Sequence, residues 1–195
     1  KSQSYEIFIP SIRKVRRFAE PARDDAWGGS DFTFGDVTLR KPKHENHELL
    51  GKTKFAGCLN VMKDVKRNKY TQNAKIAADC STDGKEVYKL KSTANDANWW
   101  YDNRVSYIDA KTFADYRTEY FKGSNKVKVI DRSWTSANLD DPRASYWAYW
   151  YGTTLATGHE TMAFIPSSVT KVNHKYKKKN LWSNKTLRKM PKKIK

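Results

Sequence analysis

Residues 53–62, Thr-Lys-Phe-Ala-Gly-Cys-Leu-Asn-Val-Met, are the stretch that decides the fold class. Phe55, Leu59 and Val61 fall on one side of an extended chain, whereas Lys54 and Asn60 fall on the other. A period of two is the signature of a β-strand with one face buried. The stretch therefore predicts a strand.

Working outward, similar short runs recur along the chain, most of them bounded by Gly, Asn, Asp, Ser or Pro. They predict further strands at 32–40, 75–80, 86–92, 104–110, 116–121, 126–131, 146–151 and 161–165. Asp83-Gly84 predicts a turn that makes a hairpin, because Gly tolerates positive φ and Asp closes a turn with its side chain. Nine strands without intervening helices favour an all-β fold, an antiparallel β-sandwich.

The two ends differ from this β-rich body, which we expect to span 24–170. In residues 1–23, apolar side chains recur every three residues from Ile9 to Phe18, and most of this run lies between Pro10 and Pro21. This spacing fits either a short amphipathic helix or an extended arm. Residues 171–195 are polar and basic, which predicts an extended tail with a few apolar anchor points.

Most of the net charge of +17 lies in that tail, which holds eleven Lys and Arg residues and no acid, so residues 1–170 keep +6. Such a run is either a solvated tail or a docking arm for acidic proteins, nucleic acid or anionic lipid. We expect it to bind a partner through Lys177, Lys178, Lys179, Trp182 and Arg188.

Two aromatic clusters are richer than one core requires: Trp99-Trp100-Tyr101 and residues 146–151, Tyr-Trp-Ala-Tyr-Trp-Tyr. Neighbouring residues of a strand face opposite ways, so we expect one aromatic face to contact a partner. Trp147 and Trp150, three residues apart, are predicted to lie on opposite faces, one in the core and one in the contact. Core packing alone is the competing interpretation.

Catalytic and metal-binding patterns are missing from the sequence, and we predict a protein that is not an enzyme and holds no cofactor. His44 and His47 alternate with Glu45 and Glu48, but in a pattern typical of a polar surface loop rather than a metal site. The acidic pairs are assigned to turns, and Gly28-Gly29 lacks the lysine and spacing of a nucleotide-binding loop. Structural turns are predicted at Asp25, Gly28, Gly29, Ser30, Asp83 and Gly84.

Cys58 and Cys80 are the only cysteines and have no zinc-binding spacing. They either form one disulfide, in an oxidising compartment, or remain two buried thiols in a reducing one. No apolar run approaches the ~18 residues that a membrane span requires, so no transmembrane segment is expected.

The segment Asp25-Ala26-Trp27-Gly28-Gly29-Ser30, followed by the strand expected at 32–39 and by Phe55-Ala56-Gly57, resembles the complex I intermediate-associated protein family. The resemblance covers 25–121, about half of the chain. It implies a galactose-binding-like jelly-roll sandwich located in the mitochondrial matrix or on the matrix side of the inner membrane. The implied role is an assembly factor or accessory subunit of respiratory complex I, with the protein subunits of that membrane-bound complex as partners.

Two other classes of protein remain open. Richness in Lys, Asn and Tyr, with residues 149–169 resembling the closing strands of a wall-binding SH3-like module, fits a secreted Gram-positive surface protein that binds anionic wall polymers. The basic tail and the aromatic clusters also fit a ribosome-associated or other RNA-binding protein. A disulfide between the cysteines would favour an oxidising exterior, and free thiols the matrix.

Overall fold

The computed structural model describes residues 5–9, 11–62, 76–165, 170, 172 and 183–189. The chain divides into two compact units, one formed by residues 23–170 and the other by residues 1–22 together with 171–195. Within the described residues, no helix has the length and apolar character needed to cross a membrane.

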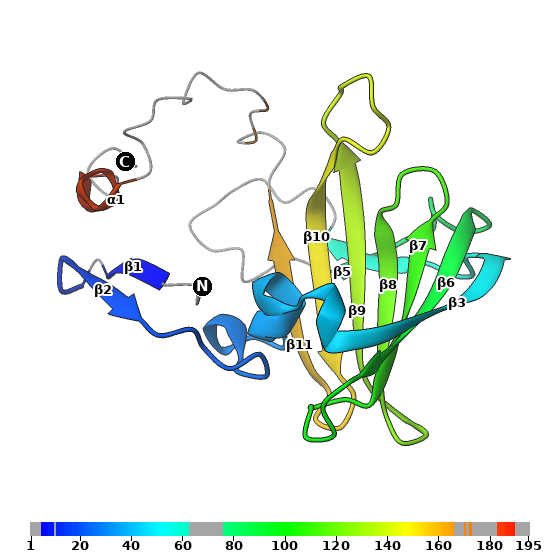
Figure 1. Ribbon diagram of the computed structural model, residues 1–195. Helices are drawn as coiled ribbons and strands as arrows, with labels where there is room; N and C mark the ends of the chain where they lie inside the picture. Colours follow the sequence, from blue (N-terminus) through cyan, green and yellow to red (C-terminus); the bar gives the residue numbers. More distant parts are fainter. Residues whose placement is uncertain are drawn as a thin grey trace. The chain divides into compact units, whose positions relative to one another are not determined.

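The larger unit is built on one seven-stranded antiparallel sheet in the order β11-β10-β9-β8-β7-β6-β3 (Figure 1). Its strands are β3 (Glu45–Lys54), β6 (Glu86–Ala94), β7 (Asn103–Asp109), β8 (Asp115–Lys122), β9 (Asn125–Ser136), β10 (Ser145–Thr154) and β11 (His159–Phe164). The all-β, antiparallel fold class is confirmed. The jelly-roll detail is replaced by a meander, because short connections pair each strand from β6 to β11 with the next.

The strand expected at 32–40 is wrong, because this segment is helical. The chain forms three short helices, η1 (Trp27–Gly29), η2 (Gly35–Leu39) and η3 (Pro42–His44), before it enters β3. The carboxylate of Asp36 accepts hydrogen bonds from the backbone N–H and the hydroxyl of Thr33, at 2.9 and 3.0 Å. This local closure competes with strand pairing, as Thr and Asp side chains commonly do.

The opening stretch 53–62 is extended but interrupted. β3 ends at Lys54, and β4 (Leu59–Met62) starts a separate two-stranded sheet with β5 (Ile76–Asp79). Gly57, with φ of 92°, lies at the break. The polar run around His44–Glu48, interpreted as a loop, instead supplies η3 and the start of β3, an edge strand whose exposed side chains hide its period.

The cysteines form a disulfide, Cys58–Cys80, beside the last pair of the β4–β5 ladder. The turn at Asp83-Gly84 is present, with Gly84 at φ of 74° and its N–H donating to the carbonyl of Phe55. It is not a hairpin turn, because β5 and β6, which it joins, belong to different sheets.

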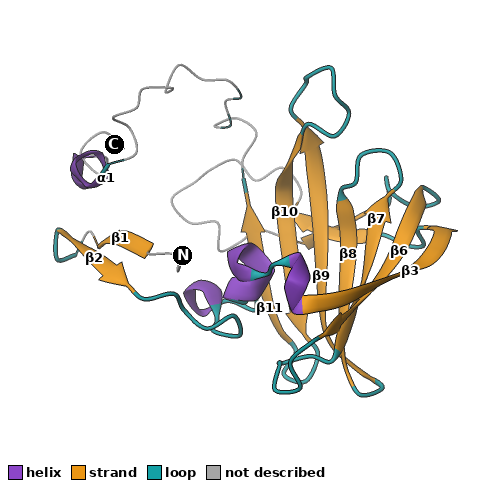
Figure 2. Cartoon of the chain, viewed as in Figure 1, coloured by secondary structure: helices purple, strands orange, loops and turns teal. Residues whose placement is uncertain are grey.

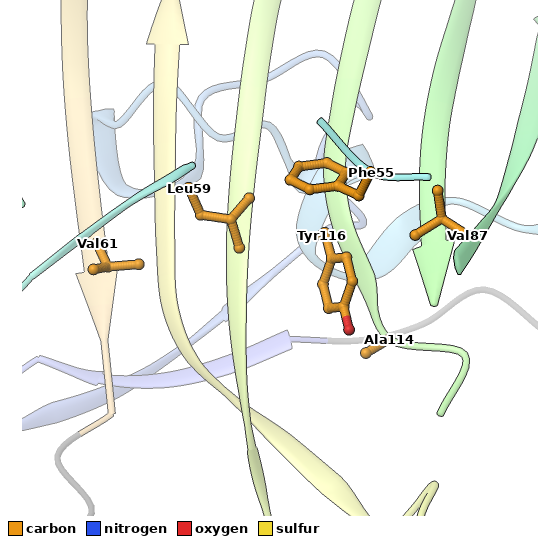
Figure 3. Close-up of a cluster of buried hydrophobic side chains, with 6 residues drawn as sticks. All are labelled: Phe55, Leu59, Val61, Val87, Ala114 and Tyr116. Carbon is orange, nitrogen blue, oxygen red and sulfur yellow. The ribbon is translucent and has the colours of Figure 1, made fainter. Parts of the chain in front are cut away.

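Both faces of the large sheet are partly covered. The face that packs against the helical segment is called the front face; the segment lies before the β9–β11 end in Figure 1. The back face is covered by β4 and by the chain leading to it. There, Phe55, Leu59 and Val61 pack toward Val87, Ala114 and Tyr116 (Figure 3). The front-face core consists of Phe32, Trp99, Tyr101, Tyr120 and Ile130.

The smaller unit contains an antiparallel hairpin, β1 (Tyr5–Ile9) with β2 (Lys14–Phe18), and the short helix α1 (Asn184–Lys189) (Figure 2). Of the two alternatives left open for residues 1–23, the helix between Pro10 and Pro21 is not formed, because Lys14–Phe18 is a strand. Arg13 turns the chain at φ of 51°, and the two strands then pair with each other, whereas a short isolated helix is marginal in water. Of the predicted tail contacts, Arg188 lies in α1, and Lys177, Lys178, Lys179 and Trp182 lie outside the described residues.

Candidate functional site

Side chains of the front face form rows that run across all seven strands, since residues paired across antiparallel strands share a face. The first row is strongly polar and reads His47, Ser92, Arg104, Tyr120, Lys128, Thr154 and His159. The second row reads Leu49, Leu90, Ser106, Thr118, Ile130, Gly152 and Thr161. The helical segment covers the first row and the β9–β11 end of the second.

Asp36 of η2 fastens the helical segment to the first row. Its buried carboxylate accepts from Lys128 Nζ at 2.6 Å, Tyr120 Oη at 2.6 Å and Arg40 Nη2 at 2.9 Å, in addition to Thr33. Burial alone would raise the pKa of Asp36, but attraction to Lys128 and Arg40 outweighs it and holds that pKa well below its usual range. With its lone pairs filled, Asp36 is a structural anion and not a proton acceptor.

Glu45 at the start of β3 forms the second buried ion pair of this region. It receives two hydrogen bonds from Arg104, at 2.8 and 2.7 Å, and one from Tyr101 Oη at 2.9 Å. Burial would raise the pKa of Glu45, yet hydrogen bonding and attraction to Arg104 lower it. The buried ion pairs of Asp36 and Glu45 thus stabilise the polar end of the front face in a closed arrangement.

The opposite end of the front face exposes apolar side chains. Leu49 of β3 is 60% exposed, and its cross-strand neighbour Leu90 is half-buried. In the next row, Tyr88 pairs with Ile108, and Phe113, 58% exposed, stacks on Tyr88 with ring centroids 6.4 Å apart. These five residues are called the apolar patch. Contiguous apolar surface of this kind marks a binding site more often than scattered exposed residues do.

A buried cation follows the patch along the same face. Arg132 pairs with Trp150 across β9 and β10, and its side chain is only 4% exposed. Its guanidinium carbon lies 4.4 Å from the centroid of the Trp150 ring, and Nη1 lies 2.9 Å from Thr118 Oγ1 and 3.0 Å from an Asp115 oxygen. A guanidinium has five N–H donors, so Arg132 has capacity for a further acceptor.

The predicted aromatic site residues separate into two groups. Trp99 and Tyr101 are buried in the front-face core, and Trp100 stacks on Trp99 at 4.9 Å, so packing accounts for this cluster. The prediction that Trp147 and Trp150 lie on opposite faces is wrong. A register shift between Trp147 and Tyr149 brings the two indole rings within 5.5 Å of each other.

The predicted turn residues lie at chain reversals. Gly28 and Gly29 have φ of 63° and 75°, a region that favours glycine. Ser30 Oγ donates to the carbonyl of Trp27 at 2.6 Å, and the Asp25 carbonyl accepts from the N–H of Phe34. Asp83 accepts a hydrogen bond from the N–H of Gly57 at 2.8 Å.

Hydroxyl–imidazole contacts on the sheet do not form a catalytic arrangement. Ser92 Oγ lies 2.9 Å from His47 Nδ1, but Ser92 is fully buried and the other nitrogen of His47 faces the carbonyl of Pro42. His159 contacts Asp31 at 2.7 Å, while the nearby threonine hydroxyls donate to Asp31 and not to the imidazole. No cluster of three potential metal ligands occurs among the residues the structure describes.

Comparison with known proteins identifies the fold. A putative outer membrane lipoprotein-sorting protein domain from Vibrio parahaemolyticus superposes with a TM-score of 0.58 at 14% identity, over 95% of this chain and 66% of that one. This chain has a similar fold. A DUF1329 family protein from Desulfovibrio piger gives 0.53 at 14% identity, over 84% of this chain and 60% of that one. The chain thus spans less than two thirds of the length of either structure.

Sequence comparison adds little to this. A family model described as "Uncharacterized protein" matches residues 1–72. No curated protein matches the sequence.

These structural neighbours overturn the resemblance to the complex I intermediate-associated family. The predicted role as a complex I assembly factor or accessory subunit and the mitochondrial location are both wrong, and the wall-polymer and RNA-binding alternatives find no support. The resemblance rested on short motifs. The Gly28-Gly29 turn leads to Phe32 in a helical segment, whereas the resemblance required a strand there.

Proposed function

We propose that the larger unit is a non-catalytic carrier that binds the acyl chain of a lipid or of a lipid-modified protein on its front face. The observation that carries this proposal is the apolar patch, where Leu49 and Phe113 are left exposed on the same face as the buried Arg132. An acyl chain gains about 0.8 kcal/mol for each buried CH₂ group, and the patch offers such burial.

Arg132 supplies the polar end of the proposed site. An acyl chain ends in a carboxylate, an ester or an amide, each of which presents an oxygen acceptor. A guanidinium stacked on Trp150 and shielded from water donates to such an oxygen more strongly than an exposed cation would. Patch and cation together favour an amphiphile over a purely apolar ligand.

Two further observations support this proposal. The neighbour from Vibrio parahaemolyticus is named as a putative lipoprotein-sorting domain, and its fold matches over nearly the whole of this chain. The disulfide Cys58–Cys80 favours an oxidising compartment outside the cytoplasm, so we propose an extracytoplasmic location.

Fluorescence titration with an environment-sensitive fatty acid, followed by displacement with a synthetic acylated peptide, tests the site. Leu49→Asp places a charge in the patch at an exposed position and should weaken binding at least about tenfold, the effect of ~1.4 kcal/mol. Leu139→Asp is the matched control, since Leu139 is 48% exposed and lies in the β9–β10 loop. Equal affinity of Leu49→Asp and the unmodified protein would show that the patch is not the site.

A further inference from the structure

The smaller unit carries nearly all of the net charge. Residues 1–22 and 171–195 contain sixteen of the 38 Lys and Arg residues and two of the 21 Asp and Glu residues. This unit therefore has a charge of +14, and residues 23–170 keep +3 of the total +17. Charge density of this kind attracts polyanionic partners and is screened by salt.

One face of the β1–β2 hairpin combines cations with exposed apolar side chains. The pairs Tyr5–Phe18, Ile7–Arg16 and Ile9–Lys14 share this face, called the outer face of the hairpin, because cross-strand partners point the same way. Ile7 is 51% exposed and Phe18 45%, and Arg16 and Lys14 are exposed as well. On the other face, Phe8 and Val15 are half-buried.

The turn of the hairpin continues this pattern. Ile12 is 47% exposed and is followed by Arg13 and Lys14. α1 packs within the same unit and adds Lys185, Arg188 and Lys189. The hairpin therefore presents exposed apolar groups surrounded by cations, with few acids nearby. This combination matches an anionic bilayer surface, because rings and aliphatic chains enter the headgroup layer while cations pair with phosphates.

From this arrangement we infer that the smaller unit docks the protein onto an anionic phospholipid membrane through the outer face of the hairpin. A nucleic-acid partner would account for the positive charge but not for the exposed Ile7, Ile12 and Phe18. The two isoleucines are aliphatic and Phe18 is separated from them, so these residues form no platform on which bases could stack. The inference goes beyond the proposed carrier function and does not depend on it.

Co-sedimentation of the full chain with vesicles tests the inference. Vesicles of phosphatidylglycerol and phosphatidylcholine should bind the protein, and vesicles of phosphatidylcholine alone should not, with binding lost at high salt. Each cation near the surface contributes about fivefold to partitioning, so Arg13→Gln/Lys14→Gln/Arg16→Gln should weaken binding about 100-fold. The matched control is Lys41→Gln/Lys43→Gln/Lys54→Gln, which removes three exposed cations from the larger unit.

A second variant separates a membrane from a generic polyanion. Ile7→Ser/Phe18→Ser should weaken vesicle binding at least about tenfold while leaving binding to dextran sulfate unchanged, because it removes apolar insertion and no charge. Unchanged vesicle binding by this variant, or equal loss in the lysine control, would overturn the inference. Leu49→Asp should bind vesicles normally, so failure of the carrier proposal and failure of this inference are distinguishable.

Discussion

At the scale of the residue, Asp36 shows how a single buried charge fixes the position of a segment. Its carboxylate pairs with two cations, Arg40, which directly follows η2, and Lys128 of β9. It also accepts a hydrogen bond from the neutral hydroxyl of Tyr120 on β8. The helical segment can therefore lie on the sheet in few other positions without leaving a buried charge unpaired.

Asp36→Asn should lower the free energy of unfolding by about 3–5 kcal/mol, since it leaves Lys128 and Arg40 without their shared anion. Urea denaturation at pH 7 measures this. The exposed pair Asp141–Arg143 provides the control, and Asp141→Asn should cost less than about 1 kcal/mol. Equal effects of the two substitutions would contradict the role assigned to Asp36.

The pH dependence has a defined sign. Lys128 and Arg40 hold the folded-state pKa of Asp36 below the usual value of 3.8 for an aspartate. The stabilising contribution of Asp36 is therefore fully present above pH 3.8 and is lost as the pH falls through the lowered pKa. Asp36→Asn should therefore lose less stability than the unmodified protein between about pH 4 and pH 2.

At the scale of the element, β4 covers part of the back face, and its strand partner is β5. The pair is only four residues long on each strand, and a two-stranded ladder of this length is marginal by itself. The disulfide Cys58–Cys80, with 22 residues of separation, closes the loop that contains both strands. It therefore holds Leu59 and Val61 against the sheet.

Cys58→Ser/Cys80→Ser should destabilise the larger unit by about 3 kcal/mol, the loop-closure cost for a loop of this length. Chemical denaturation with and without dithiothreitol measures the change. The reductant should lower the stability of the unmodified protein and leave that of the double variant unchanged. Insensitivity of both proteins to reduction would show that the bond does not form.

At the scale of the whole molecule, the chain separates into a nearly neutral β unit with its own two core clusters and a small, highly charged unit. Because each core lies within residues 23–170, that segment should fold without the rest. A fragment of residues 23–170 should unfold in urea with a midpoint close to that of the full chain and bind the fatty-acid probe equally. Loss of cooperative unfolding would show that the ends contribute to the core.

The sequence by itself determined the class of fold and most of the strands. A strand that buries one face shows an alternation with a period of two, and this pattern can be recognised without knowledge of the tertiary structure. β6 to β11 were all located within a few residues. The sequence also showed that most of the net charge, +11 of +17, lies in residues 171–195. These properties depend on neighbours along the chain, which the sequence displays directly.

Only the tertiary structure decided how those strands assemble and where a ligand would bind. The alternation at 32–40 is typical of a strand, but Lys128 and Tyr120, some ninety residues away, hold Asp36 in a helical turn. The bulge that brings Trp147 to Trp150, and the register that places Leu49 beside Leu90, are likewise set by pairing between distant strands. Exposure of an apolar residue depends on what covers it in space, and no local pattern in the sequence contains that information.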